Sequence, residues 1–181
     1  MTTKRPSVST IELSVREIQQ LFETLDPYPF LQRDLDKDAE AFIVDWAREL
    51  PRDHALKIVV HLPRDEAEAP MGRDLVQSMK AYFAHRADAV RRDLRELFRV
   101  GRMSLAIGVG VLIACSVASQ YVSTILGEGP FARVMGEGLI ILGWVANWRP
   151  LEIFLYEWWP IARRRNLYAR LAAAEIALNP T

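Results

Sequence analysis

Apolar residues are concentrated in the second half of this 181-residue chain, where one long run contains no charged side chain. That run covers residues 103–126, and as an α-helix rising 1.5 Å per residue it would extend about 36 Å. The hydrocarbon core of a bilayer is about 30 Å thick, so a helix of this length can cross it. The pattern therefore predicts a first transmembrane helix over residues 103–126.

A second apolar segment, residues 133–158, is interrupted by polar side chains and by Pro150. Two geometries fit it: one spanning helix that is kinked near Pro150, or a shorter span that ends near Trp148 and continues as a helix in the membrane interface. We favour the kinked span, because Trp158 and Trp159, followed by basic residues, are typical of the end of a transmembrane helix.

Basic residues flank the two segments on one side, and lysine and arginine near membrane segments are retained in the cytoplasm. The connection, residues 127–132, is followed by the single basic residue Arg133, so we expect it to be an external turn. This asymmetry predicts a multi-pass protein of the cell (inner) membrane with both termini in the cytoplasm. The arginines expected either to meet lipid headgroups or only to set the topology are Arg99, Arg102, Arg163, Arg164 and Arg165.

The N-terminal part of the chain predicts a small cytoplasmic α/β domain over residues 8–70, with two short strands and three helices when the long helix that follows is included. Alternating and β-branched residues indicate strands at 8–13 and 56–62. Apolar residues at helical spacing indicate helices at about 14–25, which opens with a capping-box pattern, and at 39–50.

A long connecting helix is predicted over residues 71–102, because apolar side chains recur along it by threes and fours. That stripe fits packing on the domain or a short coiled coil, and we favour packing because only three to four heptads are present. Residues 1–7 are expected to be disordered, and residues 159–181 to form a cytoplasmic tail.

Prolines and acidic residues predict two irregular segments inside the domain. The prolines of residues 26–30 each fix a backbone dihedral and push the preceding residue out of the helical region, so this segment should be a rigid extended connector. The acidic stretch at residues 64–70 is expected to be a solvated loop.

Four small side chains recur at four-residue steps along the first apolar segment, which places them on one helix face. Small faces allow close approach of helix backbones in lipid. The face could dock the second helix of the same chain or a second copy of the protein, and the sequence leaves both open. Its residues are Ala106, Gly110, Ala114 and Ala118.

Three polar residues of the second segment, Asn147, Arg149 and Glu152, are candidates for a polar site in the bilayer. Charged groups there cost several kcal/mol unless they are paired or hydrated. Arg149 and Glu152 are three residues apart and can pair on one helix face. The alternative, which we favour, is an ion pair that reaches the headgroups of the inner leaflet.

Motifs for catalysis, metal binding or cofactor binding are weak or missing in the sequence. Asp34, Asp36, Asp38 and Asp45 resemble part of a calcium loop but lack its glycine and long glutamate, so helix capping explains them better. The three histidines have no ligand spacing with one another or with Cys115. We expect no cofactor and no metal.

The formal net charge is zero, which gives no overall field that would favour nucleic acid. The expected partners are the lipid bilayer and either a second copy or another membrane protein. The leading hypothesis is a non-enzymatic membrane protein whose cytoplasmic domain serves interaction or assembly. The alternative is a subunit of a small oligomeric channel or transporter that uses Arg149 and Glu152 in the bilayer.

Overall fold

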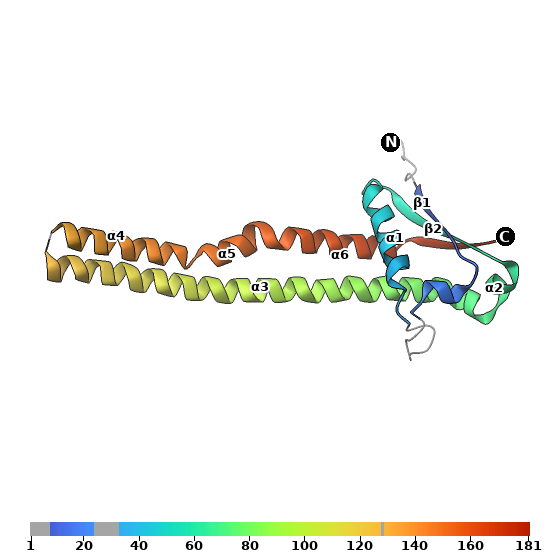
Figure 1. Ribbon diagram of the computed structural model, residues 1–181, viewed down its shortest axis with the longest axis horizontal. Coiled ribbons are helices and arrows are strands. Elements are labelled where there is room, and N and C mark those ends of the chain that lie inside the picture. Colours follow the sequence, from blue (N-terminus) through green and yellow to red (C-terminus); the bar gives the residue numbers. More distant parts are fainter. Residues whose placement is uncertain (1–7, 24–32, 128) are drawn as a thin grey trace, which may run out of the picture. The chain divides into compact units, whose positions relative to one another are not determined.

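A computed structural model describes residues 8–23, 33–127 and 129–181, and the protein is mostly helical with one small parallel sheet (Figure 1). Contacts divide the chain into two units. Unit 1 combines the chain up to Arg91 with Arg163–Thr181, and unit 2 is Arg92–Ala162. The predictions for residues 1–7 and 26–30 lie outside the described residues.

The sheet of unit 1 has three parallel strands in the order β1-β2-β3: β1 is Val8–Ser14, β2 is Ala55–Leu62 and β3 is Glu175–Pro180. Ile11, Ile58 and Ile176 lie in register across it and are buried, so one face of the sheet holds the core. The two predicted strands are present.

The expectation of only two strands is wrong, because the C-terminal segment of the predicted tail forms β3 at the edge of the sheet. Its sequence, EIALNP, has few β-branched residues and ends in proline, so it has little strand propensity of its own. Its strand conformation comes from six residue pairs with β2, from Lys57–Glu175 to Leu62–Pro180.

Short helical elements replace two other predictions in unit 1. The helix expected at 14–25 is reduced to a 3-10 helix, Ile18–Leu21, and Phe22 then forms a β-bridge with Leu35. The expected loop at 64–70 contains α2, Arg64–Glu68, which is held by the amide of Ala67 donating to the carbonyl of Pro63. Local hydrogen bonds decided both segments.

Helix α1, Lys37–Glu49, begins where Asp36 accepts hydrogen bonds from the amides of Asp38 and Ala39 at 2.9 and 3.3 Å. The capping interpretation of Asp36 is therefore confirmed. The helix ends at Glu49, two residues before Pro51, close to the predicted boundary.

Helix α3, Pro70–Leu126, is a single helix of 57 residues that runs through both units. In unit 1 its predicted apolar stripe is buried at Leu75, Met79, Phe83 and Val90. It ends at Leu126, where Gly127 adopts a positive φ of 70°, a conformation that favours glycine after a helix.

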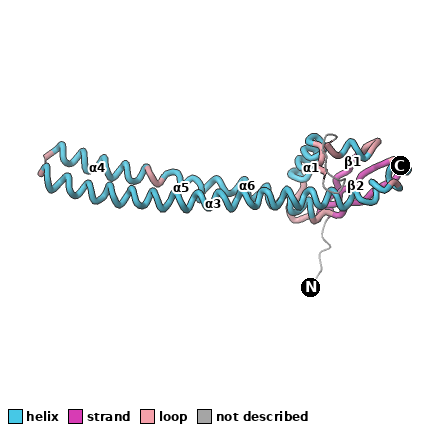
Figure 2. Tube along the Cα trace, turned by 90° about the horizontal axis from the view of Figure 1, so that it is seen from below, coloured by secondary structure: helices cyan, strands magenta, loops and turns pink. Residues whose placement is uncertain are grey.

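The chain then returns along α3 as a broken series of helices, and Figures 1 and 2 both show α4 beside the last part of α3. Helix α4 is Pro130–Val145 and α5 is Trp148–Glu152. A π-helical turn follows at Ile153–Glu157, and α6, Trp158–Ala172, leads into β3. The helical path thus breaks at Ala146–Asn147, just before Pro150 rather than at it.

Candidate functional site

The packing between α3 and α4 in unit 2 is built on glycines. A Cβ on Gly143 would lie 2.8 Å from Leu112 Cδ1 and 3.0 Å from Leu112 Cα, so a larger residue would push the two backbones apart. About two helical turns closer to the connection between α3 and α4, the hydroxyl of Ser119 donates to the carbonyl of Gly136 at 3.0 Å. Close backbone approach of this kind is typical of helix pairs in membranes.

Asn147 holds the break between α4 and α5. Its backbone amide donates to the carbonyl of Trp144 at 3.0 Å, three residues back, so the carbonyl of Gly143 loses its usual helical donor. The side-chain amide of Asn147 donates to that carbonyl and also to the carbonyl of Gly108 on α3, both at 3.0 Å. Asn147 is buried. Its side chain joins α3 to α4 and supplies the donor that the carbonyl of Gly143 would otherwise lack.

The proline next to the break lacks a backbone donor, as the sequence indicates, but it lies in the first turn of α5, where a missing amide hydrogen costs little. The break therefore results from the local turn and from the contact with α3 as much as from Pro150.

Arg149 and Glu152 pair as the sequence predicts, with Nη1 of Arg149 3.3 Å from Oε2 of Glu152. Arg149 also reaches across the π-helical turn to Glu157, with Nη2 3.2 Å from Oε2, and Glu152 accepts from the indole of Trp148 at 3.0 Å. All three charged side chains are partly exposed.

The contacts of unit 2 place this charged cluster opposite the start of the first apolar segment. A Cβ on Gly101 would meet Cγ2 of Ile153 at 2.8 Å, and the ring of Phe98 stacks on that of Phe154 with centroids 6.1 Å apart. Glu152 and Glu157 therefore lie at the same end of the helix pair as Arg99 and Arg102.

The small face predicted on α3 lies outside the contact between α3 and α4. Ala106, Gly110 and Ala114 are exposed, Ala118 is partly exposed, and a Cβ on Gly110 would meet nothing within 4 Å. The second helix uses the neighbouring face instead, where Gly101, Gly108 and Cys115 are buried. The second helix of the same chain therefore does not pack on the small face.

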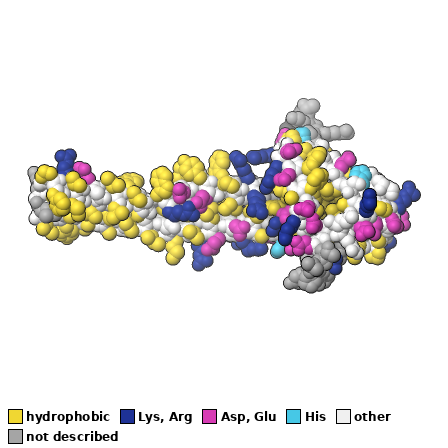
Figure 3. Space-filling view, in the orientation of Figure 1, with side chains coloured by type: hydrophobic (Ala, Val, Ile, Leu, Met, Phe, Trp, Pro, Cys, Tyr) yellow, Lys and Arg dark blue, Asp and Glu magenta, His cyan; other side chains and the backbone are white. Residues whose placement is uncertain are grey.

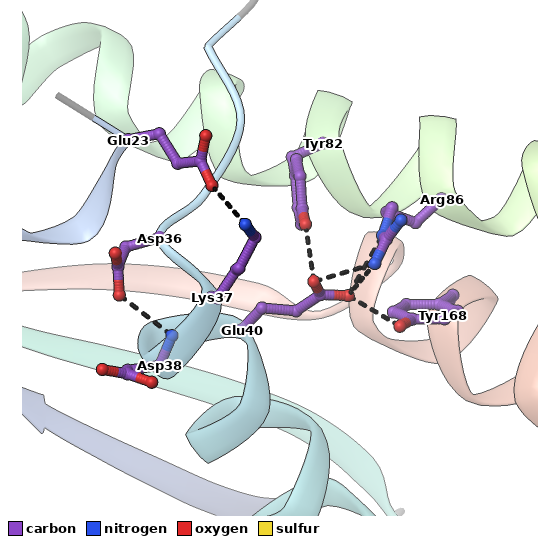
Figure 4. Close-up of polar contacts among 8 residues, drawn as sticks. All are labelled: Glu23, Asp36, Lys37, Asp38, Glu40, Tyr82, Arg86 and Tyr168. Atoms are coloured by element: carbon purple, nitrogen blue, oxygen red, sulfur yellow. Dashed lines mark hydrogen bonds and ion pairs between the residues drawn. The ribbon is translucent and has the colours of Figure 1, made fainter. Parts of the chain in front are cut away.

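A buried carboxylate in unit 1 escaped the sequence interpretation. Glu40 of α1 accepts hydrogen bonds from the hydroxyls of Tyr82 and Tyr168 at 2.8 and 2.6 Å, and from the guanidinium of Arg86 at 2.9 Å (Figure 4). The donors come from α3 and α6, so three helices meet at one side chain. A signal was present, because Glu40 lies on the same helix face as the buried Ile43 and Ala47.

The electrostatics of this cluster favour a charged Glu40. Burial alone would raise its pKa, but the hydrogen bonds from Tyr168, Tyr82 and Arg86 outweigh burial and lower the pKa below its ordinary value. Burial and the hydrogen bond to Glu40 raise the pKa of Tyr82 and of Tyr168, which stay neutral donors. With both carboxylate oxygens engaged, Glu40 connects α1 to α3 and α6.

The acidic and histidine residues considered as metal ligands do not come together in the part of the chain that the structure describes. Within residues 8–23, 33–127 and 129–181, no group of three His, Cys, Asp or Glu side chains could hold a metal ion. His61 is a strand residue as expected, 3.5 Å from Glu12 and 3.2 Å from Asn179 on the neighbouring strands. The basic residues Arg163, Arg164 and Arg165 lie on α6 in unit 1, whereas Arg99 and Arg102 lie on α3 in unit 2.

No protein-family model, curated protein or solved structure matches this chain. Its function is therefore inferred from its own residues. Two of its helices are long and apolar enough to cross a membrane, which is weak evidence for a membrane protein.

Proposed function

We propose that this chain is an integral protein of the cell (inner) membrane that crosses the bilayer twice and carries a non-enzymatic cytoplasmic domain for interaction or assembly. The spans are residues 103–126 and 133–158, joined by an external turn. The observation that carries the proposal is the exposure of the apolar helices: only 17% and 22% of their most apolar stretches are buried.

A core helix of a soluble protein buries most of its apolar surface, whereas these helices leave large side chains uncovered along their length (Figure 3). Soluble monomers rarely expose contiguous apolar patches of more than a few hundred Å². Lipid acyl chains would cover such a surface and remove the unfavourable contact of apolar side chains with water. The exposed side chains include Ile107, Ile113, Val117, Ile125, Ile141, Leu142, Trp144 and Val145.

The charged residues of the second span support this arrangement, because they are paired with one another. Arg133 pairs with Glu137 at 3.1 Å close to the turn, and Arg149 pairs with Glu152 and Glu157, close to the level at which Ile153 meets Gly101. Paired side chains near the interface can reach the headgroups at modest cost. The cytoplasmic placement of both termini rests on the excess of arginine at that end.

Carbonate extraction and cysteine labelling test the proposal. In a Cys115→Ser background, a cysteine introduced at Gly129 should react with an impermeant maleimide in intact cells, and one introduced at Arg52 should react only after lysis. The protein should stay in the membrane pellet at alkaline pH. Release by carbonate, or labelling of both positions from outside, would contradict the proposal.

Self-association is the second part of the proposal. The face formed by Ala106, Gly110, Ala114 and Ala118 is small, apolar and not used by α4, which suits the close approach of a second copy. In membranes, Ala114→Cys in the Cys115→Ser background should form a disulfide-linked dimer, and the added change Gly110→Ile should suppress it. A cysteine at Val109, an exposed residue about 120° around the helix from the centre of this face, serves as the matched control, and equal crosslinking at both positions would count against the face.

The alternative function, a channel or transporter subunit that uses Arg149 and Glu152, is less well supported. Both amide hydrogens of Asn147 are used within the chain, and Arg149 is paired with two carboxylates. Ion flux in reconstituted vesicles tests it directly: flux that disappears in Arg149→Ala and Glu152→Ala variants would favour the channel over the anchor.

A further inference from the structure

Arginine side chains form an open groove on one face of α3, immediately before the first apolar segment. The groove has a volume of about 530 Å³. With 3.6 residues per turn, its four arginines fall within an arc of about 80° and along about 15 Å of the helix axis. The lining residues are Arg92, Arg95, Glu96, Phe98, Arg99 and Arg102.

The groove is strongly cationic, since four arginines face a single carboxylate. That carboxylate, Glu96, is 3.8 Å from Nη1 of Arg99, and both side chains are well exposed, so the pair is loose. Among the described residues, Arg92, Arg95 and Arg102 form no ion pair. Planar guanidinium groups that are not committed to carboxylates are suited to bind phosphate oxygens in pairs.

Phe98 gives the groove an aromatic edge. Its ring stacks on Phe154 and lies 6.4 Å from the centre of the Trp158 ring, so it packs toward the second helical segment of unit 2. Aromatic residues of this kind are enriched where a membrane helix meets the headgroup layer. An apolar edge beside a cationic groove matches a molecule with a phosphate and an acyl chain.

We propose that this groove binds the phosphate headgroup of an anionic lipid in the leaflet that faces the cytoplasmic domain. The inference rests on the proposed membrane insertion. The headgroup layer is about 5–7 Å deep on each side, and one helical turn is 5.4 Å, so Arg102 and Arg99 fall within it. Arg95 lies about one helical turn further from the membrane core. Because Arg99 and Arg102 would lie in the headgroup layer, a lipid is favoured over a soluble anion as the ligand.

The test is a titration of the full-length protein in detergent with short-chain phosphatidylglycerol and, separately, with phosphatidylcholine of the same chain length. The wild type should bind phosphatidylglycerol at least about 10-fold more tightly. Arg95→Gln/Arg99→Gln should weaken that binding about 30-fold, since each arginine near anionic headgroups contributes a factor of about five. Glu96→Gln should strengthen it.

Arg64→Gln/Arg73→Gln is the matched control, because it removes two exposed arginines of unit 1 that do not line the groove, and it should bind like the wild type. Equal affinity for the two lipids, or no effect of the Arg95/Arg99 change, would overturn the inference. Inorganic phosphate that binds as tightly as phosphatidylglycerol, or a short oligonucleotide that displaces the lipid, would also overturn it.

Failure of this inference can be told apart from failure of the proposed function. A protein that resists carbonate extraction but shows no preference for phosphatidylglycerol contradicts the headgroup site alone. A protein that carbonate releases contradicts the membrane insertion on which the site depends.

Discussion

Glu40 shows how a single side chain can join helices that are distant in the sequence. It is 9% exposed and binds groups on α3 and α6, which are 42 and 128 residues away. Removing one partner of such a group leaves the others buried without their charge complement. Glu40 is therefore expected to matter for the stability of unit 1 more than any exposed carboxylate.

We predict that Glu40→Gln lowers the free energy of unfolding of unit 1 by about 1–2 kcal/mol, a value reduced for the partial exposure of Arg86. Hydrogen exchange of β2 amides in the full-length protein measures the change. Glu23→Gln is the matched control, because its ion pair with Lys37 at 3.5 Å is exposed and should contribute less than about 0.5 kcal/mol. Equal effects of the two changes would contradict the role of Glu40.

The lowered pKa of Glu40 predicts how this stabilisation depends on pH. A carboxyl whose pKa is lower in the folded than in the unfolded state stabilises the fold fully above the unfolded value, here 4.5. The contribution is lost as the pH falls through the folded pKa. Unfolding of the wild type and of Glu40→Gln, compared in the acid range, should show a difference that shrinks as pH falls; a constant difference would refute the assignment.

Among the helical elements, two glycines one half-turn apart on α3 should behave differently. A Cβ on Gly108 would lie 2.7 Å from Oδ1 of Asn147 and 3.0 Å from the backbone carbonyl of Ala146, while one on Gly110 would meet nothing. Gly108→Ala should therefore lower the melting temperature of the monomer in detergent by several degrees, and Gly110→Ala should leave it unchanged or raise it slightly. Similar losses in both variants would contradict the contact of Gly108 with Ala146 and Asn147 as the cause, because the higher helix propensity of alanine cannot lower the stability.

Asn147→Leu tests the broken helical path. The change removes the donors to the carbonyls of Gly108 and Gly143, so we expect a loss of about 1 kcal/mol in the stability of the helix pair. Gln120→Leu is the control, because Gln120 is an exposed residue of the same apolar stretch of α3. Thermal unfolding in detergent should give a lower melting temperature for Asn147→Leu than for Gln120→Leu. An unchanged melting temperature in Asn147→Leu would mean that the side-chain amide does not stabilise the break.

The C-terminal strand β3 pairs with β2, although both helical segments of unit 2 lie between the two strands in the sequence. Deletion of residues 175–181 should remove the buried Ile176 and the hydrogen bonds along one edge of β2. We predict rapid proteolysis of unit 1 in the truncated protein, with membrane insertion retained. A truncated domain as resistant as the wild type would mean that β3 is dispensable.

The elements that could be predicted from sequence are those with a strong local pattern. The uncharged run at 103–126, the helix that begins after Asp36 and the strand of residues 56–62 each carry their own periodicity, caps or length. The 3-10 turn at Ile18–Leu21 and helix α2 are too short for a periodic signal, and neighbouring carbonyls and amides decide their form.

Hydropathy and charge along the chain are enough to mark two apolar helices and a basic end, because both depend on local composition. Strand β3, the buried tie at Glu40 and the face of α3 that meets α4 depend instead on which distant segments come together. The small residues at 106, 110, 114 and 118 and those at 101, 108 and 115 are both regularly spaced. Only the three-dimensional packing, through Gly108 and Asn147, determines which face is covered within the chain.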